Sequence, residues 1–173
     1  MRKSIVKMIK HEKQTALNGK PARIIAKLNA LTDPAVIKEL YEASSAGVQI
    51  ELIVRGVCCL KPKIPRVSEN IRVISVVGRF LEHSRVYYFL NANHPVYCSS
   101  ADWMERNLSN RIEVCFPVLG NKLANRIIKE LEIHINTKGQ SWELQANGEY
   151  KELTFDAKEP DAQNILLNRL AQV

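Results

Sequence analysis

A strand–helix–strand pattern in the first third of the chain constrains the fold most strongly. An apolar strand pattern at 22–28 is followed by a helix start at Asp33-Pro34 and by a second apolar strand pattern at 48–54. Two strands joined by one helix within about thirty residues form a βαβ unit, in which the strands are parallel and the crossover is right-handed. The chain is therefore expected to fold in the α/β class, around a partly parallel sheet.

The remaining elements extend this sheet and cover its faces. Helices are also predicted at 2–18, 121–133 and 161–170, and strands at 71–77, 85–90, 96–98 and 112–116. Asn147-Gly148 predicts a β-hairpin between 141–145 and 149–153. We expect one domain over 1–136, followed by an extension over 137–173 that holds this hairpin and a short helix.

The 121–133 helix has an apolar stripe that should face the sheet. We expect Leu123, Ile127, Ile128 and Leu131 to point inward from it. His134 follows directly, and a positive charge there would complement the negative end of the helix dipole.

Positive charge concentrates in the middle of the chain. The formal charge is +7 and the pI is near 9.3. Nine Lys and Arg minus four Asp and Glu within 55–111 leave +5 of that total. Guanidinium groups match phosphate oxygens and stay charged at any working pH, so this region is expected to bind phosphate oxyanions. Arg55 follows a parallel strand, at the position where open α/β sheets keep their ligand crevice.

Composition limits the other classes of protein. The apolar content of 46% and charged content of 25% are ordinary for a soluble domain, and no apolar run is long enough to span a membrane. The start of the chain lacks the apolar core of a signal peptide, so a cytoplasmic location is expected. Peripheral attachment is a further option, because a basic protein also suits an acidic membrane surface. The four cysteines lack zinc-site spacing and are expected to be reduced thiols, and no residue is assigned to a metal.

Five segments resemble the C-terminal portion of bacterial polyphosphate kinases. They are 21–31 (PARIIAKLNAL), 53–60 (IVRGVCCL), 68–73 (SENIRV), 77–85 (VGRFLEHSR) and 99–104 (SSADWM). The resemblance implies a phospholipase D-like mixed sheet flanked by helices. It also implies reversible transfer of the terminal phosphate of ATP to a histidine and then onto polyphosphate. The family's phosphorylated histidine belongs to the preceding domain, so this chain is expected to supply half of the active site and to be inactive alone.

The resemblance assigns roles to individual residues. His83 is the candidate catalytic residue, as a proton donor or electrostatic partner of the transferring phosphoryl group, and the alternative is a histidine satisfied inside the fold. Arg55, Arg79 and Arg85 are the candidate contacts to the phosphates of ATP or polyphosphate. Asp102 could orient His83 or help to hold Mg²⁺ through water, and capping of the following turn is an equal alternative.

Three function classes stay open on the sequence. A polyphosphate kinase would have ATP, ADP, Mg²⁺, polyphosphate, the preceding domain and further copies of itself as partners, and no nucleic acid. A phospholipase D-like phosphodiesterase or nuclease needs His-x-Lys with an aspartate five residues after the lysine. Here Arg85 replaces that lysine and Leu90 stands at the aspartate position, which argues against this class. A non-catalytic polyanion-binding or RNA-binding module is the third class, and it predicts binding with a steep salt dependence and no preference for a nucleotide triphosphate.

Overall fold

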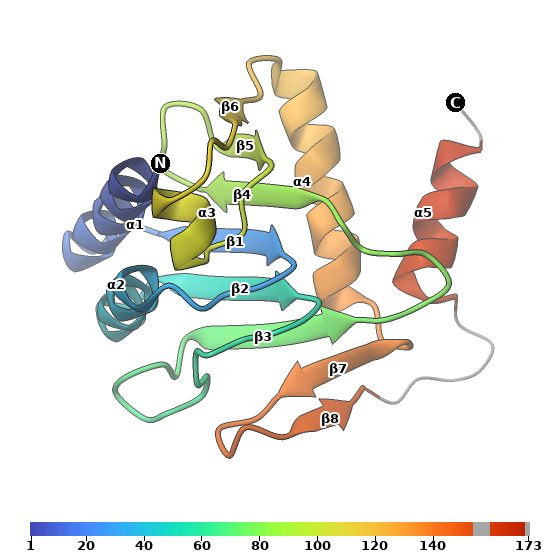
Figure 1. Cartoon of the computed structure of the whole chain (residues 1–173), viewed down its shortest axis with the longest axis horizontal. Coiled ribbons are helices and arrows are strands. Elements are labelled where there is room, and N and C mark those ends of the chain that lie inside the picture. The colour runs from blue at the N-terminus through green and yellow to red at the C-terminus, as the bar shows by residue number, and fades with distance from the viewer. Residues whose placement is uncertain (154–159, 172–173) are drawn as a thin grey trace.

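The computed structural model describes residues 1–153 and 160–171. Within them, helices flank both faces of a mixed sheet with the strand order β6-β5-β4-β1-β2-β3-β7-β8 (Figure 1). The helices are α1 (Arg2–Leu17), α2 (Pro34–Ser45), α3 (Glu105–Ser109), α4 (Asn121–Asn136) and α5 (Ala162–Leu170). The strands are β1 (Arg23–Leu28), β2 (Gln49–Val54), β3 (Ile71–Val76), β4 (Arg85–Phe89), β5 (Val96–Ser99), β6 (Cys115–Pro117), β7 (Ser141–Leu144) and β8 (Tyr150–Glu152).

The centre of the sheet is the predicted βαβ unit, which is confirmed. Strand β1 pairs in parallel with β2, and β2 pairs in parallel with β3. Asp33 caps the connecting helix, because its Oδ1 accepts a hydrogen bond from the backbone N–H of Val36 at 3.0 Å. The three parallel strands end at Leu28, Val54 and Val76, on one side of the sheet that we call the carboxyl edge.

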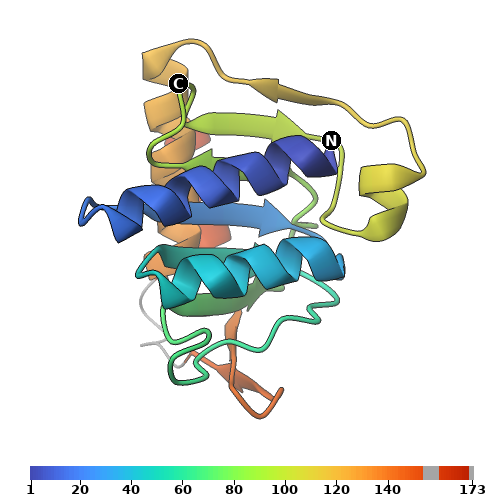
Figure 2. The same cartoon turned by 90° about the vertical axis from the view of Figure 1, so that its left-hand side faces the viewer.

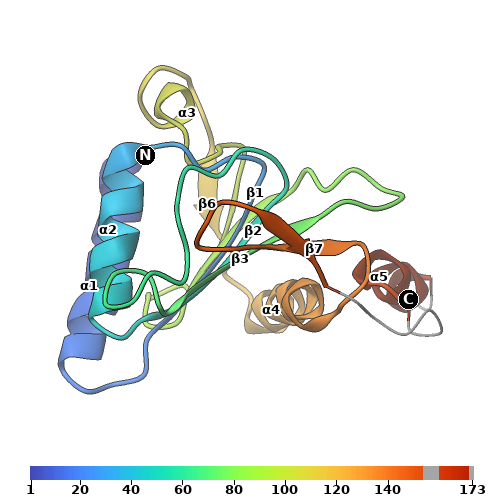
Figure 3. The ribbon, with the colours of Figure 1, turned by 90° about the horizontal axis from the view of Figure 1, so that it is seen from below.

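Helices cover the sheet in two layers. Helices α1 and α2 lie side by side over one face (Figure 2), and α4 lies over the other face with α5 beside it (Figure 3). Successive side chains of β2 point to opposite faces of the sheet and so pack against both helix layers. Leu52 and Val54 are buried under α1 and α2, whereas Ile53 belongs to the cluster under α4. Burial of each such side chain contributes about 1.5–3 kcal/mol relative to exposure. Among the described residues, every helix is too short or too polar to cross a bilayer.

The predicted C-terminal hairpin is present and continues the sheet. Strand β7 pairs with β8, and Gly148 adopts a φ of +91° in the turn between them. Strand β7 also pairs antiparallel with β3, through Ile74 to Val76 of the main sheet. The segment after residue 136 is thus joined to the rest of the chain by backbone hydrogen bonds, whereas the proposed domain boundary itself stays a prediction.

Two local predictions are wrong. The strand predicted at 112–116 is reduced to β6, because β5 ends at Ser99 opposite Cys115 and leaves residues 112–114 without a strand to pair with. Leu123 does not point inward: it is 57% exposed, because Ala124 and Leu131 mark the buried side of α4 and Leu123 lies one position away from it. The short helix α3 was not predicted, since its five residues carry no periodic apolar pattern.

Candidate functional site

The carboxyl edge gathers the residues predicted for the site. Arg55 follows β2, and residues 77–84, which we call the anion loop, follow β3 and run back to β4 (Figure 1). Because β4 is antiparallel to β1, Arg85 at its start lies at the same edge. Strand β5 is antiparallel to β4, so Asp102 soon after its end also returns there. Segments that are far apart in the sequence therefore meet at one side of the sheet.

Arg55 and Arg79 line a common cavity of about 250 Å³, whose other walls are residues 76–78 and 80–82. The Nη1 atom of Arg55 is buried, and within the described part of the chain it has no hydrogen-bond partner. A buried charged donor without an acceptor is unfavourable, so an anion in this cavity would be stabilised by it. Arg79 is exposed, and its guanidinium lies 5.3 Å from the centre of the Phe80 ring. The cavity is smaller than most sites for whole ligands, which is in keeping with a phosphate group.

Arg85 is held by Asp102 in a bidentate ion pair. Its Nε donates to Oδ1 at 3.2 Å and its Nη2 to Oδ2 at 3.1 Å, and both side chains are largely buried. Its Nη1 donates to the backbone carbonyl of His83 at 2.9 Å. Asp102 Oδ1 also accepts from the backbone N–H of Asn29 at 2.7 Å. The carboxylate thus joins the ends of β1 and β5 to the start of β4, and the prediction that it orients the His83 imidazole is wrong.

His83 lies on the outer side of the anion loop. It is exposed, so the alternative of a histidine satisfied inside the fold is also wrong. It follows Glu82, which lines the Arg55 cavity, and its carbonyl is fixed by Arg85. The imidazole is therefore at the same edge as the two arginines of the cavity and is open to another molecule or domain.

A buried charged cluster beneath the anion loop was missed by sequence reasoning. Lys27 of β1 donates to Glu82 Oε2 and to Ser84 Oγ, each at 2.6 Å. Burial tends to raise the pKa of Glu82, but the hydrogen bond and charge of Lys27 outweigh it, and the pKa is lowered. The signal was a lysine within the apolar run from Ile24 to Leu28, since a buried lysine requires a partner.

His134 approaches this cluster from α4. Its Nε2 lies 3.8 Å from Glu82 Oε2, and burial lowers its pKa to about 4 despite the attraction of that carboxylate. At neutral pH the imidazole is therefore uncharged. The predicted charge–dipole role is wrong, because the residue is 4% exposed and not at a solvated helix end.

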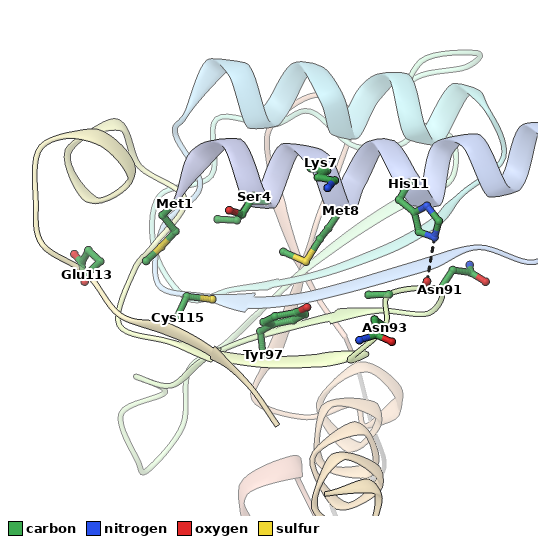
Figure 4. A pocket seen from close by; sticks show the side chains of 12 residues that line it. Met1, Ser4, Lys7, Met8, His11, Asn91, Asn93, Tyr97, Glu113 and Cys115 are labelled. Atoms are coloured by element: carbon green, nitrogen blue, oxygen red, sulfur yellow. Dashed lines mark hydrogen bonds between the residues drawn. The ribbon is translucent and has the colours of Figure 1, made fainter. Parts of the chain in front are cut away.

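A larger cavity lies away from these residues. It has about 700 Å³, between α1 and the β4–β5 hairpin, and Met8, Tyr97 and Cys115 are among its lining residues (Figure 4). His11 lies at its rim, with Nε2 3.1 Å from the carbonyl of Asn91. No arginine lines it. Size alone therefore does not identify the phosphate site.

The residues around the Arg55 cavity do not fit a protein-held magnesium ion. Across residues 1–153 and 160–171, no three carboxylate, imidazole or thiol side chains gather into a metal site. The carboxylate that lines the cavity, Glu82, is already paired with Lys27. Mg²⁺ prefers oxygen ligands and is commonly bound through substrate phosphates.

Comparison with known proteins identifies the family of this chain. The family model for polyphosphate kinase C-terminal domain 2 matches residues 1–163. The chain belongs to this family. Polyphosphate kinase from Pseudomonas aeruginosa is 54% identical over 174 residues, which cover 99% of this chain and 25% of that protein. Polyphosphate kinase 1 from Chlorobaculum tepidum is 48% identical over 172 residues, again 99% of this chain and 25% of that protein. This polyphosphate kinase domain thus spans about a quarter of the length of the curated relatives it matches.

Solved structures confirm the predicted fold. The crystal structure of polyphosphate kinase from Porphyromonas gingivalis superimposes with a TM-score of 0.91 at 40% identity, covering 99% of this chain and 27% of that one. Nuc from Salmonella typhimurium, a phospholipase D family member, gives a TM-score of 0.53 at 15% identity, covering 77% of this chain and 88% of that one. The second similarity shows the fold alone, and it agrees with the expected phospholipase D-like mixed sheet.

Proposed function

We propose that this polyphosphate kinase domain contributes half of the active site of a reversible ATP:polyphosphate phosphotransferase. The observation that carries the proposal is that Arg55, whose buried Nη1 has no hydrogen-bond partner among the described residues, lines one cavity with Arg79. A cationic cavity at the carboxyl edge of a parallel sheet is where a phosphate is expected to bind. The relatives of matching sequence are polyphosphate kinases, which supports this choice of phosphate chemistry.

The side chains suit phosphoryl transfer, which depends mainly on positioning and charge neutralisation. Arg55 is fixed at the end of β2 and binds oxygens of the terminal phosphate of ATP. Arg79 binds from the anion loop, and His83 provides a proton or positive charge to the oxygen that leaves with ADP. Arg85 holds the His83 backbone through one of its three engaged N–H groups, and its predicted contact with phosphate stays a prediction.

The other half of the site belongs to the preceding domain of the longer enzyme in this proposal. A histidine nitrogen there attacks the terminal phosphorus, the bond to the ADP oxygen breaks, and ADP leaves with the electron pair. The terminal oxygen of polyphosphate then attacks the phosphohistidine, and the N–P bond breaks. Mg²⁺ enters with the nucleotide. We further propose that the full-length enzyme is cytoplasmic, that it self-associates, and that it can attach peripherally to the membrane.

Alanine substitutions in the full-length enzyme test this function. Arg55→Ala is expected to lower kcat/KM for ATP by about 10²–10³, the usual effect of removing one donor from a developing oxyanion. His83→Ala should lower kcat. Arg111→Ala serves as the control, because Arg111 is exposed and does not line the cavity, and it should keep wild-type kinetics. Wild-type kinetics in Arg55→Ala would remove that residue, and with it the cavity, from the site.

The two alternative functions have less support. A phosphodiesterase of the phospholipase D type requires a free lysine at position 85, where Arg85 is paired with Asp102, and an aspartate at the position of the exposed Leu90. A polyanion-binding module does not require a buried unpaired donor. Thermal unfolding of the isolated chain separates this module from the kinase, because ATP should raise the Tm whereas RNA should not.

A further inference from the structure

Gln163 of α5 forms hydrogen bonds to the middle of the anion loop. Its Oε1 accepts from the backbone N–H of Phe80 at 2.8 Å, and its Nε2 donates to the carbonyl of Phe80 at 2.7 Å. The same Nε2 donates to Glu82 Oε1 at 2.7 Å. The side chain is 5% exposed, so these bonds form away from water and satisfy both backbone groups of one loop residue.

A second contact from the C-terminal segment fixes the start of the anion loop. The backbone N–H of Val77 donates to the carbonyl of Gln140 at 3.0 Å. Gly78 lies between the two glutamines: a Cβ there would be 2.2 Å from Gln140 Oε1 and 2.6 Å from Gln163 Oε1. A real Cβ does not approach other atoms this closely, so any larger residue at this position requires the two glutamine side chains to move.

The inner and outer sides of the anion loop differ as a result. Glu82 connects Gln163 to Lys27 of β1, since its two carboxylate oxygens each accept one of these donors. This inner side is tied to α5 and to the centre of the sheet. Arg79 and His83 lie on the outer side and are exposed. Gln163 itself does not line the Arg55 cavity, so any effect it has on a bound phosphate passes through the loop.

We propose that Gln163 is a positioning residue for phosphoryl transfer, and that α5 holds Arg79 and His83 in place through it. The inference rests on the proposed function of the cavity. Its physical basis is that reactions catalysed by positioning are sensitive to displacement of the catalytic groups, and a shift of about 1 Å can reduce the rate about 10²-fold. Arg55 is anchored independently on β2, so loss of the Gln163 contacts should disturb the loop and leave nucleotide binding by Arg55 largely intact.

Kinetics of the full-length Gln163→Leu enzyme test the inference. The substitution removes all three hydrogen bonds and retains an apolar stem of similar length. We expect kcat to fall at least tenfold, whereas the KM for ATP changes less than threefold. Asn168→Leu is the matched control, because Asn168 is exposed on the same helix, and it should keep the wild-type kcat. A wild-type kcat in Gln163→Leu overturns the inference.

A pH profile of Gln163→Glu separates positioning from general damage to the fold. An ionised carboxylate still accepts from Phe80 but cannot donate to its carbonyl or to Glu82, whereas a protonated carboxyl can donate one hydrogen bond. Proximity to Glu82 favours the protonated form. The ratio of variant to wild-type kcat should therefore rise as the pH falls from 8 to 6. A ratio that is constant with pH contradicts the inference.

Hydrogen exchange in the isolated chain keeps the inference testable if the full-length variant is inactive for other reasons. The Phe80 amide should exchange at least tenfold faster in Gln163→Leu, with unchanged exchange in β1. Unchanged Phe80 exchange overturns the inference. Parallel Arg55→Ala kinetics identify which idea has failed. A wild-type Arg55→Ala enzyme rejects the proposed function, whereas an impaired one beside a wild-type Gln163→Leu enzyme rejects the positioning role alone.

Discussion

The buried histidine of α4 makes the stability of this domain depend on pH in a calculable way. His134 is 4% exposed, and within the described residues its Nδ1 has no hydrogen-bond partner. Burial lowers its pKa from 6.5 to about 4, although Glu82 acts in the opposite direction. The folded state therefore favours the neutral imidazole, and the unfolded state binds a proton at a higher pH than the folded state does.

The sign and size of the effect follow from this difference. Above pH 6.5 both states hold a neutral His134 and its contribution to stability is complete. Stability is lost as the pH falls from 6.5 towards 4. A difference of 6.5 minus 4, at about 1.4 kcal/mol for each pH unit, gives a total loss of roughly 3 kcal/mol. About 2 kcal/mol of this falls between pH 7 and pH 5. Glu82 adds to this loss of stability only below about pH 4.5, the ordinary pKa of a glutamate, because its pKa is lowered in the folded state.

Urea unfolding of the isolated chain at pH 7 and pH 5 measures this loss. The free energy of unfolding should be about 2 kcal/mol smaller at pH 5 in the wild type, and the difference should be largely abolished in His134→Asn. His94→Gln is the control, since His94 lies in the turn between β4 and β5, and it should keep the wild-type difference. Equal stability of the wild type at both pH values, or the same pH difference in His134→Asn, would refute the reasoning.

Two further predictions concern the packing around the site and are measured by urea unfolding. Asp102→Ala should lower the free energy of unfolding by about 3–5 kcal/mol, because Arg85 is left as an uncompensated, largely buried charge; a loss below 1 kcal/mol would show that water replaces the carboxylate. Leu52→Ala should cost about 2–5 kcal/mol, since Leu52 is fully buried under α1 and α2. The same change at the exposed Leu123 should stay within about 0.5 kcal/mol, and equal losses at both positions would contradict the burial described for α4.

Local signals explain which parts of the fold could be predicted from the sequence. The cap at Asp33, the parallel pairing of β1 with β2 and the turn at Gly148 each depend on residues close together in the chain. Pairing of β7 with β3 depends on residues about seventy positions apart, for which the sequence carries no pattern. The prediction that Leu123 points inward was wrong, because an apolar residue at the margin of a helical stripe can lie on the buried or on the exposed side of the helix.

In the candidate site, too, contacts between residues far apart in the sequence could not be predicted. The common edge for Arg55 and Arg79 could be predicted, because both follow parallel strands of one sheet. The partner of Arg85 could not, because a carboxylate 17 residues away is one of several within reach of an arginine. Gln163 carried no signal at all, since a glutamine in a terminal helix is ordinarily a solvated residue.

The hydrogen bonds between Gln163 and Phe80 can form only after the strands of the sheet have been synthesised. The two residues are 83 positions apart, and Gln163 is synthesised after every described strand of the sheet. A product that stops or is clipped shortly before α5 would retain the strands of the sheet and both of its covering layers. Such a product is expected to fold but to lack the hydrogen bonds that Gln163 makes to the anion loop. The proposed positioning role therefore makes α5 a requirement for turnover rather than for folding.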